Sequence, residues 1–378
     1  ITKRKFMIKI KEVQTKSELK KFIDFPWMHY RNDIHWVPPL KMSVKALFDP
    51  KHPFHKTSEM KSWLALDEQN KIVGRISAIH NRAYNDFQGA SAGFFGFYES
   101  IDSIEVTNAL FATAEKYLKE KGATEMIGPM SPSTNYECGI LVEGYESPAY
   151  LMMSHNPSYY DKLLINVGLS KSKDLLAFLV DTNTQLPERM LKAAEHNEKK
   201  ANITYRKINV KNWNAEIELM HKIYNSAWEK NWGFVPMNKE EFFHTAKDLK
   251  AIVDDNLIIF VSVGAEPVGF VVTLPDYNQV FKQIPDGKLL PFGIFKLFNA
   301  KKYITQVRVI TLGIDPRFQN LGLGSLLYKQ AQVEVTKNPR YKKAEMSWVL
   351  EDNDSMTRPL YAMGSTVHKR FRVYNKNI

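Results

Sequence analysis

The sequence predicts a mixed α/β (α+β) protein with two tandem domains, each built on a mixed central sheet flanked by helices. Three observations lead to this fold class. The chain has 378 residues, which is too many for one small core and suits two domains. The order strand, helix, strands, helix, strand occurs twice along it. The second copy contains a buried strand, a glycine-bearing turn and a helix between Gln306 and Gln330, and the other elements are arranged around that stretch.

The first predicted domain covers residues 1–182. Alternating apolar residues predict a strand from Phe6 to Val13, and Ser17 is expected to cap the helix that follows. Gly122 is expected to end an amphipathic helix that begins at Thr107. The same periodicities predict strands at 62–66, 72–79, 93–98, 125–127 and 173–180, a polar loop at 128–148 and a late helix at 156–169.

Residues 183–202 are predicted to form a charged helical connector, and the second domain covers 203–378. Asn238 is the expected cap of a helix at 239–251. The remaining predicted elements are helices at 213–228 and 353–363 and strands at 203–210, 257–263, 267–274, 307–314, 343–349 and 366–374. An insertion at 275–303 separates two of these strands.

The turn after the strand at 307–314 has the character of an anion site. Asp315-Pro316 ends the strand, and Gly322 and Gly324 leave backbone N–H groups uncovered where a helix begins. The dipole of that helix adds partial positive charge at the same place. The glycine spacing matches neither the dinucleotide pattern G-x-G-x-x-G nor the phosphate loop G-x-x-x-x-G-K-[ST]. The turn therefore predicts a phosphate-binding site of another kind.

Ile314-Asp315-Pro316 and the following Gln319-Asn320-Leu321-Gly322-Leu323-Gly324 resemble the acyl-CoA-binding motif of the GCN5-related N-acetyltransferase (GNAT) superfamily. That motif has an apolar residue two before a proline, then Gln/Arg-x-x-Gly-x-Gly/Ala at the start of a helix. Many members have glycine where this chain has Asn320, and asparagine also accepts left-handed backbone angles. The resemblance covers the second half well, and the first half by the order of its elements and its late helix.

The resemblance implies that acetyl-CoA or another acyl-CoA is the co-substrate of the second domain. Backbone groups near Leu312 and Ile314 would bind the pantetheine as an added strand, and one free N–H there would stabilise an oxyanion. Seven residues of the turn would bind the pyrophosphate: Gln319, Asn320, Leu321, Gly322, Leu323, Gly324 and Ser325. Asn353, at the start of the late helix, would contact the cofactor arm. Tyr361, on nearly the same face, would be the general acid beside the sulfur; the alternative for Tyr361 is a core aromatic residue.

The first domain is expected to have the fold without a cofactor site. The segment from Glu99 to Asp102 follows its strand at 93–98, is acidic and has no glycine, so it would repel a pyrophosphate at a helix start. The chain thus resembles tandem GNAT proteins with one degenerate half.

The general base and the acceptor are not assigned by the sequence. Glu345, Glu351 and His244 are candidates for the base, and each is expected to be a surface group. The acceptor is expected to be the amine of a small molecule or peptide, near Asn135 and Glu137 or near the pair Tyr159-Tyr160. Oligomeric state, acyl length and the role of the first domain beyond its fold are also left open.

Composition limits the location and the partners. Cys138 is the only cysteine, so an internal disulfide and a cysteine-based zinc site are excluded, and no metal site is predicted. A lone thiol and the lack of a membrane-length apolar run or an evident secretory signal suggest a cytoplasmic protein. The net charge is +11, but the lysines are scattered without a nucleic-acid motif, so no specific nucleic acid is expected.

The insertion carries an apolar and basic stretch from Lys288 to Lys302. We expect it to form a lid over a groove or between the domains, because long ordered insertions are often functional loops. Membrane contact through 288–302 is the less favoured alternative, since Pro291 and Gly293 oppose one long interfacial helix.

These features predict an acyl-CoA-dependent N-acyltransferase, a transferase of the GNAT type, that most simply transfers acetyl to a primary amine by direct attack in a ternary complex. The first alternative is an aminoacyl-tRNA-dependent enzyme of the peptidoglycan-bridge type on the same double fold. The second is a non-catalytic module that binds CoA or membranes.

Overall fold

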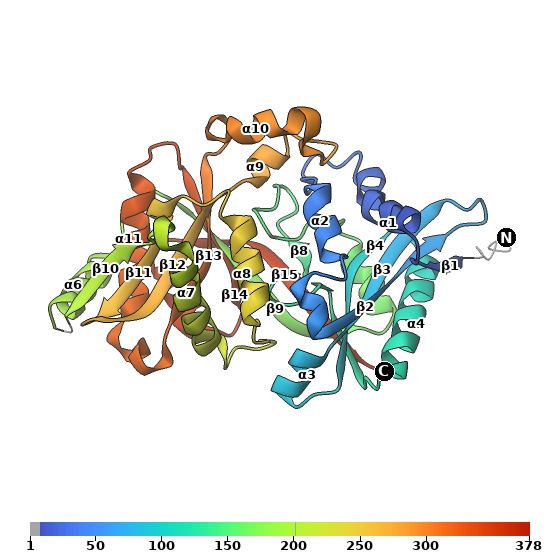
Figure 1. Ribbon diagram of the computed structural model, residues 1–378, viewed down its shortest axis with the longest axis horizontal. Coiled ribbons are helices and arrows are strands. Elements are labelled where there is room, and N and C mark those ends of the chain that lie inside the picture. The colour runs from blue at the N-terminus through green and yellow to red at the C-terminus, as the bar shows by residue number, and fades with distance from the viewer. Residues whose placement is uncertain (1–7, 201) are drawn as a thin grey trace. The chain divides into compact units, whose positions relative to one another are not determined.

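The computed structural model describes residues 8–200 and 202–378 (Figure 1). The first two residues of the strand expected at Phe6–Val13 lie outside this part. The chain forms two compact units. Unit 1 comprises Ile1–Asp174, Phe281–Ile294 and Arg370–Ile378, and unit 2 comprises Leu175–Val280 and Phe295–Lys369. The predicted domains, 1–182 and 203–378, differ from these units, because the C-terminal segment and part of the insertion belong to unit 1.

Unit 1 contains a sheet in the order β1-β2-β3-β4-β5-β15, with β8 also pairing with β15. Its strands are β1 (Lys9–Glu12), β2 (Ser58–Leu66), β3 (Ile72–Asn81), β4 (Ala92–Ser100), β5 (Glu125–Gly128), β6 (Met130–Ser131), β7 (Glu137–Cys138) and β8 (Ile140–Glu143). Its helices are α1 (Lys16–His29), α2 (Lys41–Leu47), α3 (Arg82–Gln88), α4 (Ile104–Glu120) and α5 (Tyr160–Asn166). The main core of this unit lies between the sheet and α4, around Phe95, Leu110 and Phe111.

Unit 2 contains a sheet in the order β9-β14-β13-β12-β11-β10. Its strands are β10 (Ile203–Lys207), β11 (Ile258–Val263), β12 (Glu266–Pro275), β13 (Gln306–Ile314) and β14 (Lys343–Leu350). Its helices are α6 (Glu188–Lys200), α7 (Trp213–Trp228), α8 (Lys239–Leu249), α9 (Asn278–Phe281), α10 (Ile294–Phe298), α11 (Leu323–Thr336) and α12 (Asp354–Ala362). The end residues Phe281 and Ile294 of α9 and α10 are counted in unit 1.

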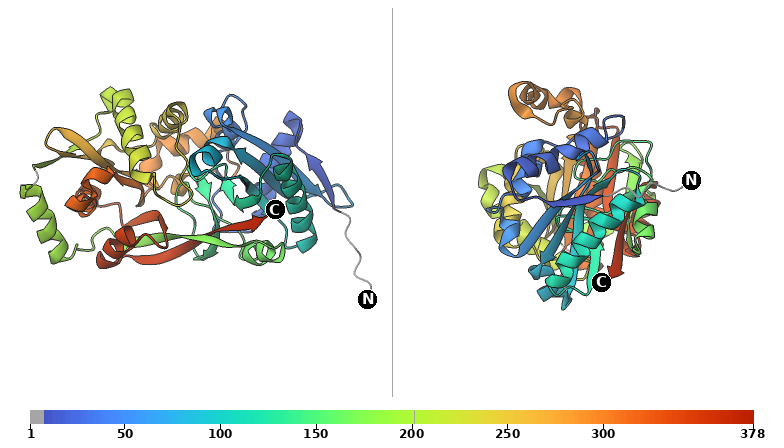
Figure 2. Two further views of the ribbon diagram at one scale, coloured as in Figure 1. Left: turned by 90° about the horizontal axis from the view of Figure 1, so that it is seen from below. Right: turned by 90° about the vertical axis from the view of Figure 1, so that its right-hand side faces the viewer.

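Two strands supply residues to both units, namely β9 (Ser170–Asp181) and β15 (Thr366–Asn377). Within unit 1, Tyr374 of β15 pairs with Gly128 of β5, and Lys376 donates to Glu115 Oε1 of α4 at 2.7 Å. The C-terminal end of the chain therefore lies beside α4 (Figure 2). The last strand was expected to close the second domain, but most of it completes the sheet of unit 1.

Most expected elements are present, with differences at their ends. The first helix begins at Lys16, two residues earlier than a cap at Ser17 would give, because Thr15 caps it and Glu18 completes a capping box. The helix expected from Thr107 begins at Ile104, capped by Ser103. The polar loop expected at 128–148 contains three short strands, and α2 and α3 were not predicted. Helices this short carry too few turns to show a clear period in the sequence.

No helix among residues 8–200 and 202–378 is long and apolar enough to cross a membrane.

Candidate active site

The central strands of unit 2 separate at their ends. β13 and β14 are parallel and pair from Gln306–Lys343 to Val309–Met346. Beyond that point only the pairing of β14 with β9 continues, since Val349 and Leu350 pair with Leu176 and Leu175. The four residues Val309–Leu312 of β13 are only partly buried, although they lie in the middle of a sheet. The two strands therefore leave an opening along one edge of β13.

Backbone groups of Leu312 and Ile314 face this opening. The register places Ile314 opposite Gly269 and Leu312 opposite Val271 on the antiparallel neighbour β12. Asp315 N donates to Val268 O at 2.8 Å, so that pair is a hydrogen-bonded one. Hydrogen-bonded and non-hydrogen-bonded pairs alternate in an antiparallel ladder. Leu312 and Ile314 therefore point their N–H and C=O groups away from β12, where an extended ligand could add as a strand.

The turn after β13 leads directly into an uncapped helix. Asp315 Oδ1 accepts from Arg317 N at 3.0 Å, and Pro316–Leu321 form a 3₁₀ turn. Gly322 has φ +69° and ψ 21°, a left-handed conformation that favours glycine. α11 then begins at Leu323 without a side-chain cap. Its first N–H groups thus remain available to an anion.

The left-handed residue of this turn is Gly322 and not Asn320. Asn320 lies inside the 3₁₀ turn and has no positive φ. Asn320 therefore does not occupy a left-handed position, and its tolerance of such angles is not used. Gln319 Nε2 donates to Ile314 O at 3.3 Å, which ties the turn back to the end of the strand.

Gly324 leaves room at the helix start. A Cβ added there would meet only Ile314 Cδ1, at 3.7 Å, which is an ordinary contact. Leu323 is fully buried beneath the turn, whereas Ser325 is partly exposed beside Gly324. The glycine, the open space and the uncapped N–H groups together fit a pyrophosphate.

Asn353 and Tyr361 lie at opposite ends of α12. Asn353 is the cap residue, and its Oδ1 accepts from Ser355 Oγ at 2.6 Å. Tyr361 is 55% exposed, and its ring packs edge-on against Phe178 with 5.0 Å between the ring centres. The alternative of a core aromatic residue is therefore wrong for Tyr361, although its role as an acid stays a prediction.

A buried charged network, which was not predicted from the sequence, lies on β13, β14 and β15 next to the opening. Arg308 Nε donates to Ser347 Oγ at 2.8 Å, and Ser347 Oγ donates to Glu345 Oε1 at 2.5 Å. The second oxygen of Glu345 lies 2.7 Å from His368 Nε2. Glu345 is fully buried, so its expected surface location is wrong. His368 retains partial exposure.

The network lies on one face of the sheet, opposite α11. Val309 and Met346 pack into the core that contains Tyr328 of α11, so the alternating residues Arg308, Glu345 and Ser347 face the other side. Of this group only Glu345 was a predicted site candidate, and Arg308, Ser347 and His368 were not. The signal of His368 in the sequence is a single polar residue within a strand pattern, which surface histidines also produce.

The side of β13 that carries Gly313 is covered by α7. A Cβ on Gly313 would come within 2.2 Å of the Trp228 ring, so glycine permits this close approach. Thr311, two residues earlier, points to the same side. Its buried Oγ1 has no hydrogen-bond partner among the described residues. An unpaired buried hydroxyl beside the opening is a suitable contact for a polar group of a substrate.

The two other candidates for the base have ordinary surroundings. His244 lies on α8, about a third of its side chain is exposed, and its Nδ1 is 3.7 Å from Asp248 Oδ2. Glu351 is partly buried in the turn between β14 and α12. Neither residue belongs to the network of Glu345 and His368.

The corresponding region of unit 1 is filled by the chain itself. β4 and β5 pair in parallel from Ala92–Glu125 to Phe94–Ile127. Beyond that pairing Phe97 N donates to Ser131 Oγ at 3.0 Å, and a Cβ on Gly96 would lie 1.7 Å from Met130 O. Ser103 Oγ accepts from Val106 N and so caps the helix that follows. Backbone and side chain thus occupy the positions that stay open in unit 2.

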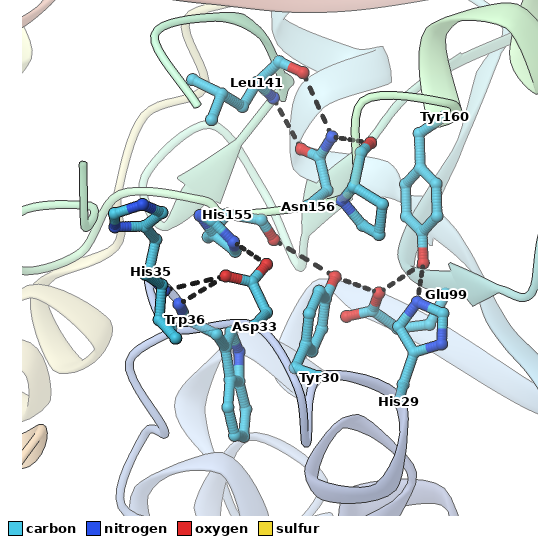
Figure 3. A network of polar contacts seen from close by, with 12 residues as sticks. His29, Tyr30, Asp33, His35, Trp36, Glu99, Leu141, His155, Asn156 and Tyr160 are labelled. Carbon is cyan, nitrogen blue, oxygen red and sulfur yellow. Dashed lines mark hydrogen bonds and ion pairs between the residues drawn. The ribbon is translucent and has the colours of Figure 1, made fainter. Parts of the chain in front are cut away.

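Acidic Glu99 does not face an empty turn, because it lies inside a polar network of unit 1 (Figure 3). Tyr30 and Tyr160 donate to Glu99 Oε2 at 2.6 and 2.7 Å. Burial, together with the negative charge of Glu99, raises the pKa of Tyr30 and of Tyr160 well above the usual range. Burial lowers the pKa of His29, which contacts the Tyr160 hydroxyl at 3.0 Å. These groups are therefore held neutral around one partly buried carboxylate.

The same network accounts for the tyrosine pair that was considered for the acceptor. Tyr159 donates to Ser100 O at 2.8 Å, and Tyr160 is fully engaged with Glu99 and His29 (Figure 3). Both hydroxyls are hydrogen-bonded within unit 1, which argues against a contact with the acceptor. A second pair in this network, His155 Nε2 and Asp33 Oδ2 at 2.7 Å, fixes the loop before α5 to the end of α1.

Known proteins resemble the chain in sequence. Residues 217–364 match the family model described as "Acetyltransferase (GNAT) family". The chain is 33% identical over 369 residues to "Protein YghO" of Escherichia coli (strain K12), which covers 96% of this chain and 94% of that protein. It is also 33% identical over 374 residues to a protein named "Bacterial ceramide synthase" from Caulobacter vibrioides, covering 96% of both.

Solved structures show the same fold. A tandem GNAT protein from the clavulanic acid biosynthesis pathway has a TM-score of 0.60 and 10% identity, and 98% of each chain is covered. A GCN5-related N-acetyltransferase from Sphaerobacter thermophilus has a TM-score of 0.53 and 10% identity, with 98% of this chain and 95% of that chain covered. The predicted fold class, tandem and mixed α/β, is confirmed by these likenesses.

Proposed function

Because this chain belongs to the acetyltransferase (GNAT) family, we propose that it transfers an acyl group from acyl-CoA to the primary amine of an apolar, lipid-like acceptor. The family makes it an N-acyltransferase. The observation that carries the use of acyl-CoA is the uncapped helix start at Gly322 and Gly324 beside the open edge of β13. Acetyl is the simplest acyl group on sequence grounds. The name of the Caulobacter relative supports a longer one, because a ceramide is an amide of a long-chain amino alcohol and a fatty acid.

Acyl-CoA supplies an activated thioester, and the residues of this chain position it and move protons. The N–H groups of Leu323, Gly324 and Ser325 would bind the pyrophosphate, with Gln319, Asn320 and Leu321 shaping the turn. Asn353 would contact the cofactor arm from the start of α12. The free edge at Leu312 and Ile314 would hold the pantetheine and donate one N–H to the oxyanion that develops.

The amine must lose a proton before it attacks. We assign this step to His368, because it is the partly exposed member of the buried network and imidazole commonly serves as a general base. Glu345 would orient the ring through its 2.7 Å contact with Nε2 and balance the positive charge that forms. Ser347 and Arg308 would fix Glu345 in turn. Tyr361, with its exposed ring, would return a proton to the leaving thiolate.

The proposal is tested by detecting the amide product with mass spectrometry. Acetyl-CoA, palmitoyl-CoA and an aminoacyl-tRNA are each combined with a long-chain amino alcohol and with a short polyamine. We expect the highest kcat/KM for palmitoyl-CoA with the long-chain amine. A preference for acetyl-CoA and the polyamine would keep the enzyme class but refute the lipid-like acceptor. An amide formed only with aminoacyl-tRNA, or binding of CoA without any turnover, would refute the proposal as a whole.

A further inference from the structure

The stretch from Lys288 to Lys302, here called the apolar segment, carries large apolar side chains on its outer side. It consists of a π-helical turn at Leu289–Gly293, the short helix α10 (orange in Figure 1) and a 3₁₀ turn at Ala300–Lys302. Leu290 is 74% exposed, Phe292 77%, Phe295 59% and Phe298 77%. Of the exposed phenylalanines in the described part of the chain, only Phe87 lies elsewhere.

Two of the exposed rings share one side of α10. Phe295 and Phe298 are three residues apart in this helix, so they are neighbours on one face, and Phe292 comes three residues before them in the π-helical turn. The opposite side is packed, because Leu297 and Ala300 contact the cluster of Val280 and Ile304. Ile294 N donates to Leu289 O, and Asn299 N donates to Phe295 O at 3.2 Å. The segment is therefore an ordered element that presents apolar side chains to the outside.

This arrangement opposes the expected lid. A lid that covers a groove would bury its apolar side, whereas three of these four side chains are more than 70% exposed. Contiguous apolar exposure of this kind marks a surface that another body covers.

The charge around the apolar segment indicates what that body is. Residues 281–303 contain five lysines and a single acid, Asp286. Lys288, Lys301 and Lys302 are exposed, and in the described residues none of the three forms an ion pair with a carboxylate. Arg340 donates to Lys301 O at 2.6 Å and adds a further cation at the same place. Phenylalanines flanked by free cations suit the interface of an anionic bilayer, where the rings enter the acyl boundary and the lysines meet headgroup phosphates.

We propose that the apolar segment binds the enzyme to the surface of an anionic phospholipid membrane. The rings of Phe292, Phe295 and Phe298 enter the interface, and Lys288, Lys301 and Lys302 contact the headgroups. This docking is peripheral, in keeping with the lack of a spanning helix among the described residues. It rests on exposure and charge alone and holds whether or not the proposed acceptor is correct.

Vesicle sedimentation tests this docking with the full chain and no substrate. Vesicles of phosphatidylcholine and phosphatidylglycerol in equal parts are compared with vesicles of phosphatidylcholine alone. We expect binding to the anionic vesicles that weakens at high salt. The double variant Phe292→Ser/Phe298→Ser should reduce the partition coefficient by about tenfold or more, because two rings no longer enter the interface.

Two matched controls separate the segment from the rest of the surface. Ile165→Ser removes an apolar side chain on α5 that is 52% exposed, and it should leave vesicle binding unchanged. Lys301→Gln/Lys302→Gln should reduce the salt-dependent part of binding, whereas Lys116→Gln/Lys119→Gln on α4 should not. Unchanged binding of the double phenylalanine variant would overturn the proposal. So would light scattering that shows a dimer converted to a monomer by that variant, since the segment would then contact a second copy.

CoA titration keeps this result apart from the proposed function. Phe292→Ser/Phe298→Ser should bind CoA as the unchanged protein does, because both phenylalanines are exposed and neither belongs to the turn that ends at Gly322. If the double phenylalanine variant loses vesicle binding but keeps CoA binding and turnover of a dispersed amine, the result supports the docking alone. If the unchanged protein binds vesicles but shows no turnover, the result contradicts only the proposed function.

Discussion

At the scale of single residues, the buried charges of unit 2 are the most informative feature. Removing a carboxylate and a guanidinium from water costs several kcal/mol each unless hydrogen bonds compensate. Both groups have such hydrogen bonds: Arg308 donates to Ser347, and Glu345 contacts Ser347 and His368. The alternation of the strand at 343–349 places Glu345 beside apolar neighbours but does not reveal a partner on another strand. The network could therefore not be predicted from the sequence, whereas the glycines of the turn could.

His368→Gln tests the proposed base. Glutamine can still donate to Glu345, so the fold should persist, but it cannot take up the proton. We expect kcat to fall by about 10²–10⁴-fold with an unchanged Kd for CoA. His244→Gln, on the partly exposed histidine of α8, is the matched control and should have no effect. Equal rates for the two variants would exclude His368 as the base.

Tyr361→Phe tests the proposed acid. The ring contact with Phe178 is kept, and only a hydroxyl on an exposed side chain is lost. Single-turnover measurements should show a decrease in kcat of about 10²–10⁴-fold. Tyr328→Phe removes a buried hydroxyl in the core of the same unit and should leave the rate unchanged. An unchanged rate with bound acyl-CoA would remove Tyr361 from the mechanism.

At the scale of elements, the strand, turn and helix start predicted at 306–330 agree with β13 and the beginning of α11. The sequence predicts this stretch well because its backbone conformation favours glycine: Gly322 is left-handed, and Gly324 leaves the helix start open. The last strand shows the opposite case. Its residues 366–374 predict a strand correctly, but nothing in their pattern specifies a neighbour, and β15 pairs with β5 and β8 of unit 1. Strand pairing depends on contacts far apart in the sequence, which periodicity does not encode.

Asp174 anchors β15 within unit 1 and makes its stability depend on pH. Burial by itself would raise the pKa of Asp174, but hydrogen bonds from Arg372 and Lys171 outweigh it and hold the pKa below the usual value. A lowered pKa in the folded state stabilises the protein above the pKa of the unfolded chain, about 3.9, and this contribution is lost as pH falls through the folded value.

Asp174→Asn should lower the free energy of unfolding by about 3 kcal/mol at pH 7, since Arg372 and Arg370 lose a buried partner. The deficit should shrink as the pH is lowered toward the acid range, where the carboxylate of the unchanged protein is itself protonated. Urea unfolding at several pH values measures both. Asp248→Asn, at a side chain that is 68% exposed, serves as control. A deficit that stays constant from neutral to acid pH would contradict the role of the ionised carboxylate.

At the scale of the whole molecule, two units of similar element order differ where their central parallel strands end. In unit 2 the central strands separate and the helix after β13 starts uncapped. In unit 1 Met130 and Ser131 lie along β4 and Ser103 caps the next helix. The sequence predicted a first domain without a cofactor site, because the acidic, glycine-free segment at Glu99–Asp102 would repel a pyrophosphate. In the structure the Glu99 carboxylate instead accepts hydrogen bonds from the buried Tyr30 and Tyr160. The region beside β4 is occupied by Met130 and Ser131, which belong to the segment 128–148 that was expected to be a loop.

Calorimetric titration with CoA, acetyl-CoA and palmitoyl-CoA tests the central claim most directly. The asymmetry between the units predicts saturable binding of one molecule per chain. Gly324→Asp should weaken it by at least about 100-fold, because it places a negative charge at an anion site, while Gly324→Ala should fold normally and retain measurable affinity. Equal melting temperatures for the three proteins would show that the loss is local. Binding of two molecules per chain, binding that survives Gly324→Asp, or no binding to any of the three ligands would contradict the account.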